Sequence, residues 1–254
     1  MAQAALTAFI GQNIMLFFLA FARIGTALLV MPGFGDNRVP QRVKIAFAVL
    51  LTMTLFAALP LPPVSDQSSL LVLLIGFEVM VGVFLGMGVR LFYVALQIVG
   101  GIVGYASSLS NALAPPDANF EGASTIGAML QMALLALFFA ADIHHVLIEG
   151  FLRSYNAMPV GSLMLGGMVE QMARLGAQSF QIAVMVGAPF LVFTILLNLS
   201  LGLANRVMPS MQVFFVAGPG LILIGLTILA IAGPSILDHV AAALSGWLID
   251  LVAP

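Results

Sequence analysis

The sequence predicts an all-α protein of the integral membrane type, built from kinked helices and helical hairpins. Of its 254 residues, 62% are hydrophobic and only 7% are charged, whereas roughly a quarter of a soluble domain is charged. Long apolar blocks follow one another along the chain, and glycine, proline or asparagine interrupts several of them. Only lipid or other apolar protein can solvate so much apolar surface. The chain is therefore expected in a membrane or in a membrane-bound assembly.

The apolar blocks give the expected helices in order. They cover residues 7–31, 43–59, 70–106, 126–148, 176–204, 211–233 and 238–252. The first block runs past the length of a signal-peptide core without a basic residue before Arg23, so a cleavable signal is not expected. A spanning helix needs about 20 residues. The third block can therefore form two short passes, broken near Arg90, or one very long helix. The distribution of lysine and arginine among the loops favours two passes. The last block is short and is expected to be an interfacial or packed end.

Helix-breaking residues inside the apolar blocks predict irregular helices. Lipid penalises exposed backbone groups, so such breaks are tolerated only where protein or a wet cavity surrounds them. The interrupting residues are Pro189, Asn198, Asn205, Pro209, Gly218 and Pro219. Two glycine pairs, Gly82/Gly86 and Gly100/Gly104, have the GxxxG spacing that lets helices approach closely. Tight helix packing is expected at both pairs.

Ionisable side chains inside apolar sequence are candidates for pairing or function. Glu78 and Arg90 would differ by about 120° on one helix. They are therefore expected to find partners on other helices or subunits, although Arg90 is also placed to snorkel at an interface. Asp142, His145 and Glu149 share a helical face and have ligand types suited to a divalent metal or a proton relay. A helix end entering water explains them better, so no metal site is assigned.

Several function classes find no support in the sequence. It has no cysteine, and its net charge of −2 does not favour nucleic acid. The hydrolase, metalloprotease and P-loop motifs are absent from the sequence. No catalytic residue and no cofactor are therefore expected. A secondary solute transporter, with broken helices and buried charges around a midplane site, remains open as one function class.

Two long motifs carry a family resemblance. The stretch ARIGTALLVMPGFGDNRVPQRVKIAFAVLLT, residues 22–52, resembles the first signature of the FliR family of flagellar biosynthetic proteins. The stretch LANRVMPSMQVFFVAGPGLILIGL, residues 203–226, is similar to the second signature and differs from it at Ser210 and Gln212. The segment 142–159 is similar to the histidine-containing segment of the same family. The injectisome export proteins are close relatives, but the Met-Pro-Gly-Phe-Gly stretch favours the flagellar branch.

The resemblance implies a subunit of the flagellar type III protein export gate in the bacterial inner membrane, at the flagellar basal body. Its expected partners are FliP-like and FliQ-like subunits, other export apparatus proteins, unfolded protein substrates and membrane lipid. It also implies that residues 1–175 form a FliP-like helical part and residues 176–254 a FliQ-like helical hairpin. The injectisome homologue of this gate and the solute transporter remain the alternatives.

The resemblance further implies that the polar insert at about residues 106–125 plugs the pore. Its hydroxyl and amide side chains can satisfy an irregular backbone, and Pro115 and Pro116 stop helix propagation. The expected plug residues are Ser107, Ser108, Leu109, Ser110, Asn111, Ala112, Leu113, Ala114, Pro115, Pro116, Asp117, Ala118, Asn119 and Phe120. The expected residues of subunit contacts or helix breaks are Glu78, Arg90, Asn205, Arg206, Pro209, Gln212, Gly218 and Pro219.

Overall fold

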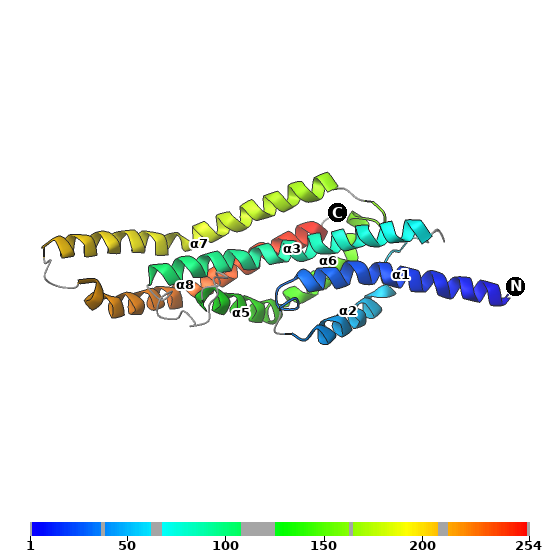
Figure 1. Ribbon diagram of the computed structural model, residues 1–254, viewed down its shortest axis with the longest axis horizontal. Coiled ribbons are helices and arrows are strands. Elements are labelled where there is room, and N and C mark those ends of the chain that lie inside the picture. Colours follow the sequence, from blue (N-terminus) through cyan, green and yellow to red (C-terminus); the bar gives the residue numbers. More distant parts are fainter. Residues whose placement is uncertain are drawn as a thin grey trace. The chain divides into compact units, whose positions relative to one another are not determined.

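The computed structural model describes residues 2–36, 39–61, 68–107, 125–162, 165–207 and 213–252 (Figure 1). All regular structure in these residues is helical, which confirms the all-α prediction. The helices are α1 (Ala2–Val30), α2 (Gln41–Phe56), α3 (Ser68–Ala106), α5 (Thr125–Ala140), α6 (Ile143–Ala157), α7 (Leu165–Val207) and α8 (Val213–Val252).

Four of the helices are long and apolar enough to cross a membrane, namely α1, α3, α7 and α8. The pair α5 and α6 adds a fifth candidate if this broken pair acts as one span. The apolar segment of α7 alone has 42 residues, about twice what a bilayer core requires. These lengths confirm the membrane-type character that the composition predicts.

Three boundaries differ from the predicted blocks. The preference for two passes in residues 70–106 is wrong, because α3 continues through Arg90 without a break. The blocks 211–233 and 238–252 form one helix, α8, which contains Pro219 and Pro234. The block 126–148 is broken instead, because Asp142 has a left-handed backbone with φ of 57° and α6 begins after it.

The described helices fall into two compact units. The first unit contains α1, α2, α3 up to Leu91, α6, α7 up to Leu175 and α8 from Leu244. Within it, α3 packs tightly on α1 at the first glycine pair. A Cβ atom at Gly86 would lie 2.6 Å from the carbonyl oxygen of Ala27, and one at Gly82 would meet Thr26 Oγ1. The first GxxxG pair therefore lies at a close helix contact, as predicted.

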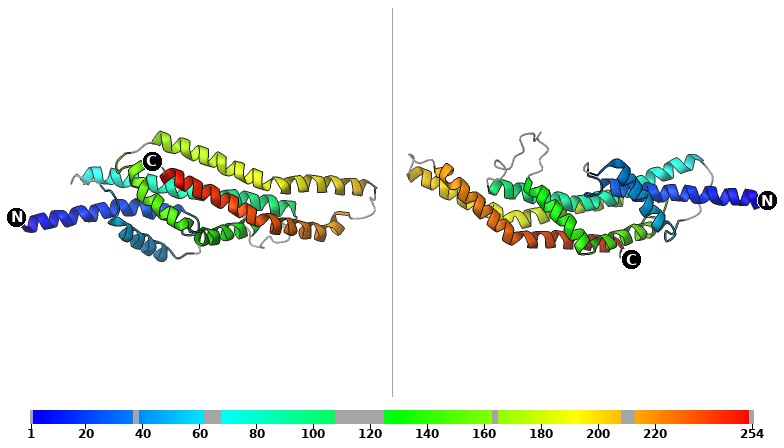
Figure 2. Two further views of the ribbon diagram at one scale, coloured as in Figure 1. Left: turned by 180° about the vertical axis from the view of Figure 1, so that it is seen from behind. Right: turned by 90° about the horizontal axis from the view of Figure 1, so that it is seen from below.

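The second unit contains α3 from Phe92, α5, α7 from Gly176 and α8 up to Ala243. Gly100 of α3 lies directly against the backbone of Gly127 in α5. The side-chain amide of Gln131 in α5 donates to the carbonyl of Tyr93 in α3 over 3.1 Å. Within this unit α7 and α8 form an antiparallel hairpin (Figure 2). The two units do not coincide with residues 1–175 and 176–254, and the FliP-like and FliQ-like character of those two parts stays a prediction.

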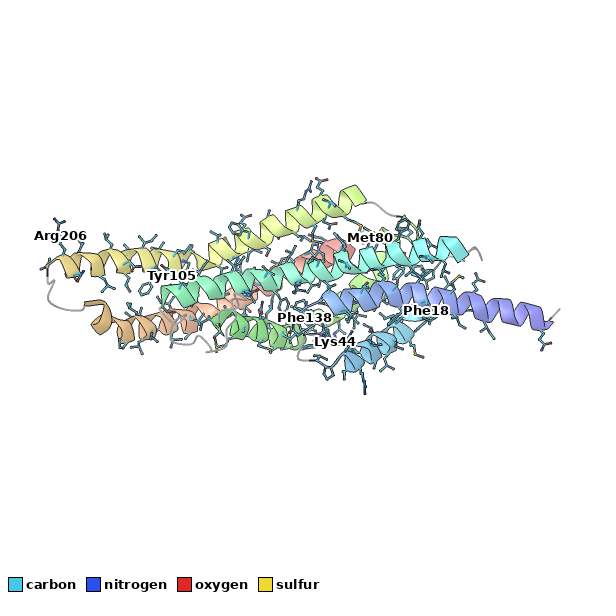
Figure 3. All side chains as sticks on the ribbon, in the orientation of Figure 1. Phe18, Lys44, Met80, Tyr105, Phe138 and Arg206 are labelled. Carbon is cyan, nitrogen blue, oxygen red and sulfur yellow. The ribbon has the colours of Figure 1, made fainter. Side chains whose placement is uncertain are left out.

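Large apolar side chains project outward along the part of α7 in this unit (Figure 3). They include Leu191, Val192, Ile195, Leu196, Leu199 and Leu203. Two polar side chains among them bond to their own helix: Asn198 donates to the carbonyl of Thr194 over 2.9 Å, and Ser200 to that of Leu196 over 2.8 Å. This surface is therefore mainly apolar. The side chains of Asn198 and Ser200 donate hydrogen bonds to backbone carbonyls of their own helix, as a lipid or protein environment requires.

Candidate functional site

A buried ion pair joins α1 and α3 in the first unit. The Nε atom of Arg23 lies 2.6 Å from Oε2 of Glu78, and Nη2 donates to Oε1 over 2.9 Å. The Arg23 side chain is 0% exposed and that of Glu78 is 1% exposed. Such a two-pronged contact fits the planar fork of the guanidinium to a carboxylate. The pair thus holds two helices together at a position shielded from solvent.

Helix α6 and the residue after it complete the surroundings of Arg23. Nη1 of Arg23 donates to Oγ of Ser154 over 3.2 Å, and Nη2 donates to the carbonyl of Met158 over 2.9 Å. The guanidinium carbon lies 3.8 Å from the centre of the Tyr155 ring, which is a cation–π arrangement. We call Arg23, Glu78, Ser154, Tyr155 and Met158 the Arg23 cluster. It connects three segments that are far apart in sequence.

A close contact between α1 and α3 brings the two charges together. Gly82 follows Glu78 by one helical turn on α3, and its missing side chain lets α1 approach at the backbone of Arg23. Burying a charge is costly unless it is paired and hydrogen-bonded, and here several donors of Arg23 are used. The cluster can therefore fix the register of α1, α3 and α6 but has no feature of a catalytic centre.

Sequence reasoning singled out Glu78 but did not assign its partner. The structure gives Glu78 a partner on another helix of the same chain, and its expected role in a subunit contact stays a prediction. Arg23 was missed as a site residue, although an arginine inside the apolar block 7–31 was a usable signal. Arg90 lies on the same helix as Glu78 but has an exposed side chain.

The remaining residues predicted for subunit contacts or helix breaks lie on α7 and α8 or outside the described residues. Asn205 and Arg206 are exposed in the last turn of α7, where Figure 3 labels Arg206. Gly218 is half-buried and Pro219 is exposed, and both lie inside α8. Pro209 and Gln212 lie outside the described residues. An exposed arginine at the end of an apolar helix leaves its charge available to a neighbouring molecule.

Only the first residue of the predicted plug is described. Ser107 follows the end of α3, is buried, and donates from Oγ to the carbonyl of Val103 over 2.5 Å. In the same unit it lies against α8 at Gly225, where a side chain would collide with Ser107. The other predicted plug residues, 108–120, lie outside the described residues. The plug therefore stays a prediction. The residue at which the insert begins, Ser107, is packed against α8.

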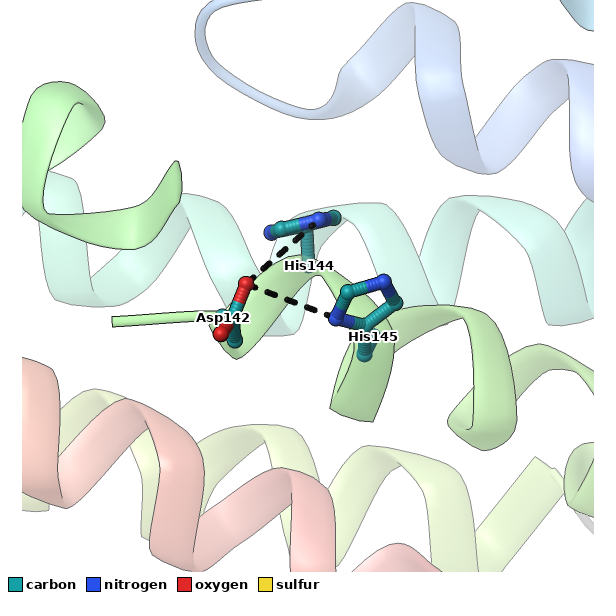
Figure 4. A group of neighbouring side chains, drawn as sticks. All are labelled: Asp142, His144 and His145. Carbon is teal, nitrogen blue, oxygen red and sulfur yellow. Dashed lines mark ion pairs between the residues drawn. The ribbon is translucent and has the colours of Figure 1, made fainter. Parts of the chain in front are cut away.

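The polar residues at the start of α6 are grouped differently from the sequence prediction. Glu149 forms an ion pair with Arg153 over 2.6 Å and does not join Asp142 and His145. Asp142 Oδ1 instead faces two imidazoles, at 3.6 Å from Nδ1 of His145 and 4.0 Å from Nε2 of His144 (Figure 4). The prediction assumed that Asp142, His145 and Glu149 lie on one face of a continuous helix. Asp142 instead precedes α6, so its carboxylate faces His144, which the helical spacing did not include.

The family model and the most similar curated proteins agree on one family of bacterial export proteins. The chain matches the model of the family described as "Bacterial export proteins, family 1" over residues 14–246. It is 36% identical to the flagellar biosynthetic protein FliR of Caulobacter vibrioides, covering 84% of this chain and 86% of that protein. It is 24% identical to FliR of Escherichia coli, covering 94% and 93% of the two chains. With FliR of Bacillus subtilis the identity is 29%, covering 80% of each chain.

Proposed function

The chain belongs to bacterial export protein family 1, and from this membership we propose that it is a subunit of the flagellar type III protein export gate. The observation that carries the proposal is the match to FliR of Caulobacter vibrioides at 36% identity over most of both chains. A flagellar export component with several membrane-length helices belongs in the bacterial inner membrane. We place it at the flagellar basal body, where flagellar export takes place.

The partners of the gate are FliP-like and FliQ-like subunits and other export apparatus proteins. The apolar side chains that project from α7 support this part of the proposal, because a chain on its own leaves them uncovered. The exposed Arg206 at the end of α7 adds a charge that a neighbouring subunit can pair. Lipid covers whatever part of this surface the other subunits leave free.

The role of the chain is to build a channel for unfolded flagellar proteins, with the insert between α3 and α5 as its plug. The insert is rich in hydroxyl and amide side chains, contains Pro115 and Pro116, and has no lysine or arginine. Such a segment can close a pore without binding acidic cargo strongly. The role is structural, and no residue of the Arg23 cluster is assigned to catalysis.

Copurification tests the proposed assembly. The chain carries a non-histidine affinity tag, is expressed with and without FliP-like and FliQ-like subunits, and is isolated in mild detergent. The proposal predicts a defined complex with the partners and aggregation or degradation without them. A stable, monodisperse monomer that takes up one solute would instead identify a transporter.

A further inference from the structure

We propose that Asp142, His144 and His145 form a binding site for one divalent transition metal ion. Each of these residues offers one ligand atom, and the three ligand atoms lie within 4.8 Å of one another. Asp142 directly precedes α6 and the two histidines lie in its first turn, and Figure 4 shows the carboxylate facing both imidazole rings. The site is separate from the Arg23 cluster and goes beyond the export function proposed above.

The distances between ligand atoms fit a shared ion better than direct hydrogen bonds. Asp142 Oδ1 lies 3.6 Å from Nδ1 of His145 and 4.0 Å from Nε2 of His144. Both distances exceed the 2.7–3.2 Å of an N–H···O hydrogen bond. Metal–ligand bonds of about 2.0–2.1 Å in a tetrahedral site place the ligand atoms about 3.3 Å apart. The three ligand atoms, all within 4.8 Å of one another, would have to move closer together to bind one ion.

The Asp142 carboxylate does not cap α6. An aspartate before a helix normally caps it by accepting a hydrogen bond from an amide of the first turn. Asp142 makes no such capping bond and has φ of 57°, a left-handed conformation that is uncommon for a residue with a side chain. The Asp142 carboxylate therefore accepts no capping hydrogen bond from α6, and its oxygens can bind an ion.

The types of ligand determine the class of metal. Two imidazoles and one carboxylate suit zinc and its first-row neighbours, whereas calcium and magnesium prefer oxygen ligands alone. Three protein ligands leave at least one coordination position for water or for a group from a neighbouring molecule. The side chains of Asp142 and His145 are 74% and 69% exposed, and that of His144 is 27% exposed. An ion can therefore enter directly from solvent.

Binding would fix the start of α6. One ion would connect the residue before the helix with two residues of its first turn. The same helix carries Ser154 and Tyr155, which contact Arg23. The expected result is a more stable first turn of α6, since the ion binds only where the three ligands are held together.

Zinc titration of the detergent-solubilised complex tests the site. The complex is isolated through a non-histidine tag, stripped with chelator, and titrated with Zn²⁺ against a chromogenic competitor. The variants are Asp142→Asn and His145→Ala, and the matched control is His239→Ala. His239 on α8 is the third of the three histidines of the chain and is exposed. Because partner chains can bind zinc themselves, only differences between variants and wild type are compared.

The proposal predicts one more Zn²⁺ per copy of the chain in wild type and His239→Ala than in the two site variants. Loss of one ligand should weaken binding by at least about tenfold, since even outer-shell changes cost that much. Equal zinc binding in all four proteins would overturn the proposal and leave only a surface ion pair. If one site variant fails to assemble, the Co²⁺ spectrum of the stripped wild type is compared with that of the other site variant. Visible bands of a four- or five-coordinate ion that are present in the wild type and lost in the variant support the site, and identical spectra refute it.

Discussion

Arg23 on α1 and Glu78 on α3 form a two-pronged ion pair, with 2.6 Å between Nε and Oε2, and the pair is almost completely shielded from solvent. The two residues are 55 positions apart in the sequence. Ser154 and the Met158 carbonyl of another segment accept further hydrogen bonds from the same guanidinium. One side chain therefore joins three segments, and removing it affects all of them.

The first prediction concerns this pair. Replacing Arg23 by Met leaves the Glu78 carboxylate buried without its partner, which typically costs about 3–5 kcal/mol. The variant should give a much lower yield of the detergent-solubilised complex, as measured by size-exclusion chromatography. The double variant Arg23→Met/Glu78→Met should recover part of the yield, because no charge is then left buried. Equal yields of the single and double variants would show that the charges do not stabilise each other.

The second prediction concerns the contact of α3 with α1. A Cβ at Gly82 would meet Thr26 Oγ1 and the carbonyl oxygen of Arg23, and backbone atoms cannot move aside cheaply. Gly82→Ala should therefore destabilise the complex by roughly 1–3 kcal/mol, the usual cost of overpacking. The readout is its melting temperature in detergent. Gly76→Ala is the matched control, since nothing lies within 4 Å of a Cβ at that position of the same helix. A similar shift for both variants would contradict the close contact.

Much of the fold could be predicted from composition and block length. The apolar blocks correctly indicated membrane-length helices, because a run of apolar residues constrains the environment of a helix directly. Proline and glycine were poorer guides. Pro189 and Pro219 were expected to interrupt helices, yet α7 continues through Pro189 and α8 through Pro219, since packing can compensate for one lost hydrogen bond. The break at Asp142 had no signal in hydropathy, because it depends on one backbone angle.

The candidate site could be predicted only in part. Glu78 was noticeable because a carboxylate in apolar sequence needs a partner. That the partner is Arg23 depends on which faces of α1 and α3 meet, and this is a property of the packed structure. The same limit applies to His144, which joins Asp142 and His145 only because α6 starts after Asp142.

The third prediction concerns the end of α7. Arg206 is exposed in this chain and lies in the last turn of an apolar helix. If a neighbouring subunit buries it against a partner group, Arg206→Ala should lower recovery of the complex several-fold and reduce swimming motility. Arg174→Ala is the control, because this exposed arginine on α7 pairs with Glu170 of the same helix. Such surface pairs contribute little. Normal assembly and normal motility of the Arg206→Ala variant would show that Arg206 makes no important contact with a neighbouring subunit.

The fourth prediction concerns the plug. Deleting Ala112–Asn119 shortens the insert but keeps the contacts of α3 with α5 at Gly100 and Gly127. The complex should still assemble, while conductance of the inner membrane to ions should rise, because only the closure is lost. Conductance and flagellin secretion are measured in the same strain. An intact, impermeable membrane with normal secretion would identify an ordinary loop, and altered uptake of one solute would identify a transporter lid.

The most direct test of the export-gate proposal is the amount of flagellin in the culture medium of a strain that lacks this chain. The proposal predicts that flagellin is made but stays inside the cell, and that expressing the chain restores its export. Uptake of small solutes should be the same in both strains. Normal flagellin export without the chain would contradict the proposal.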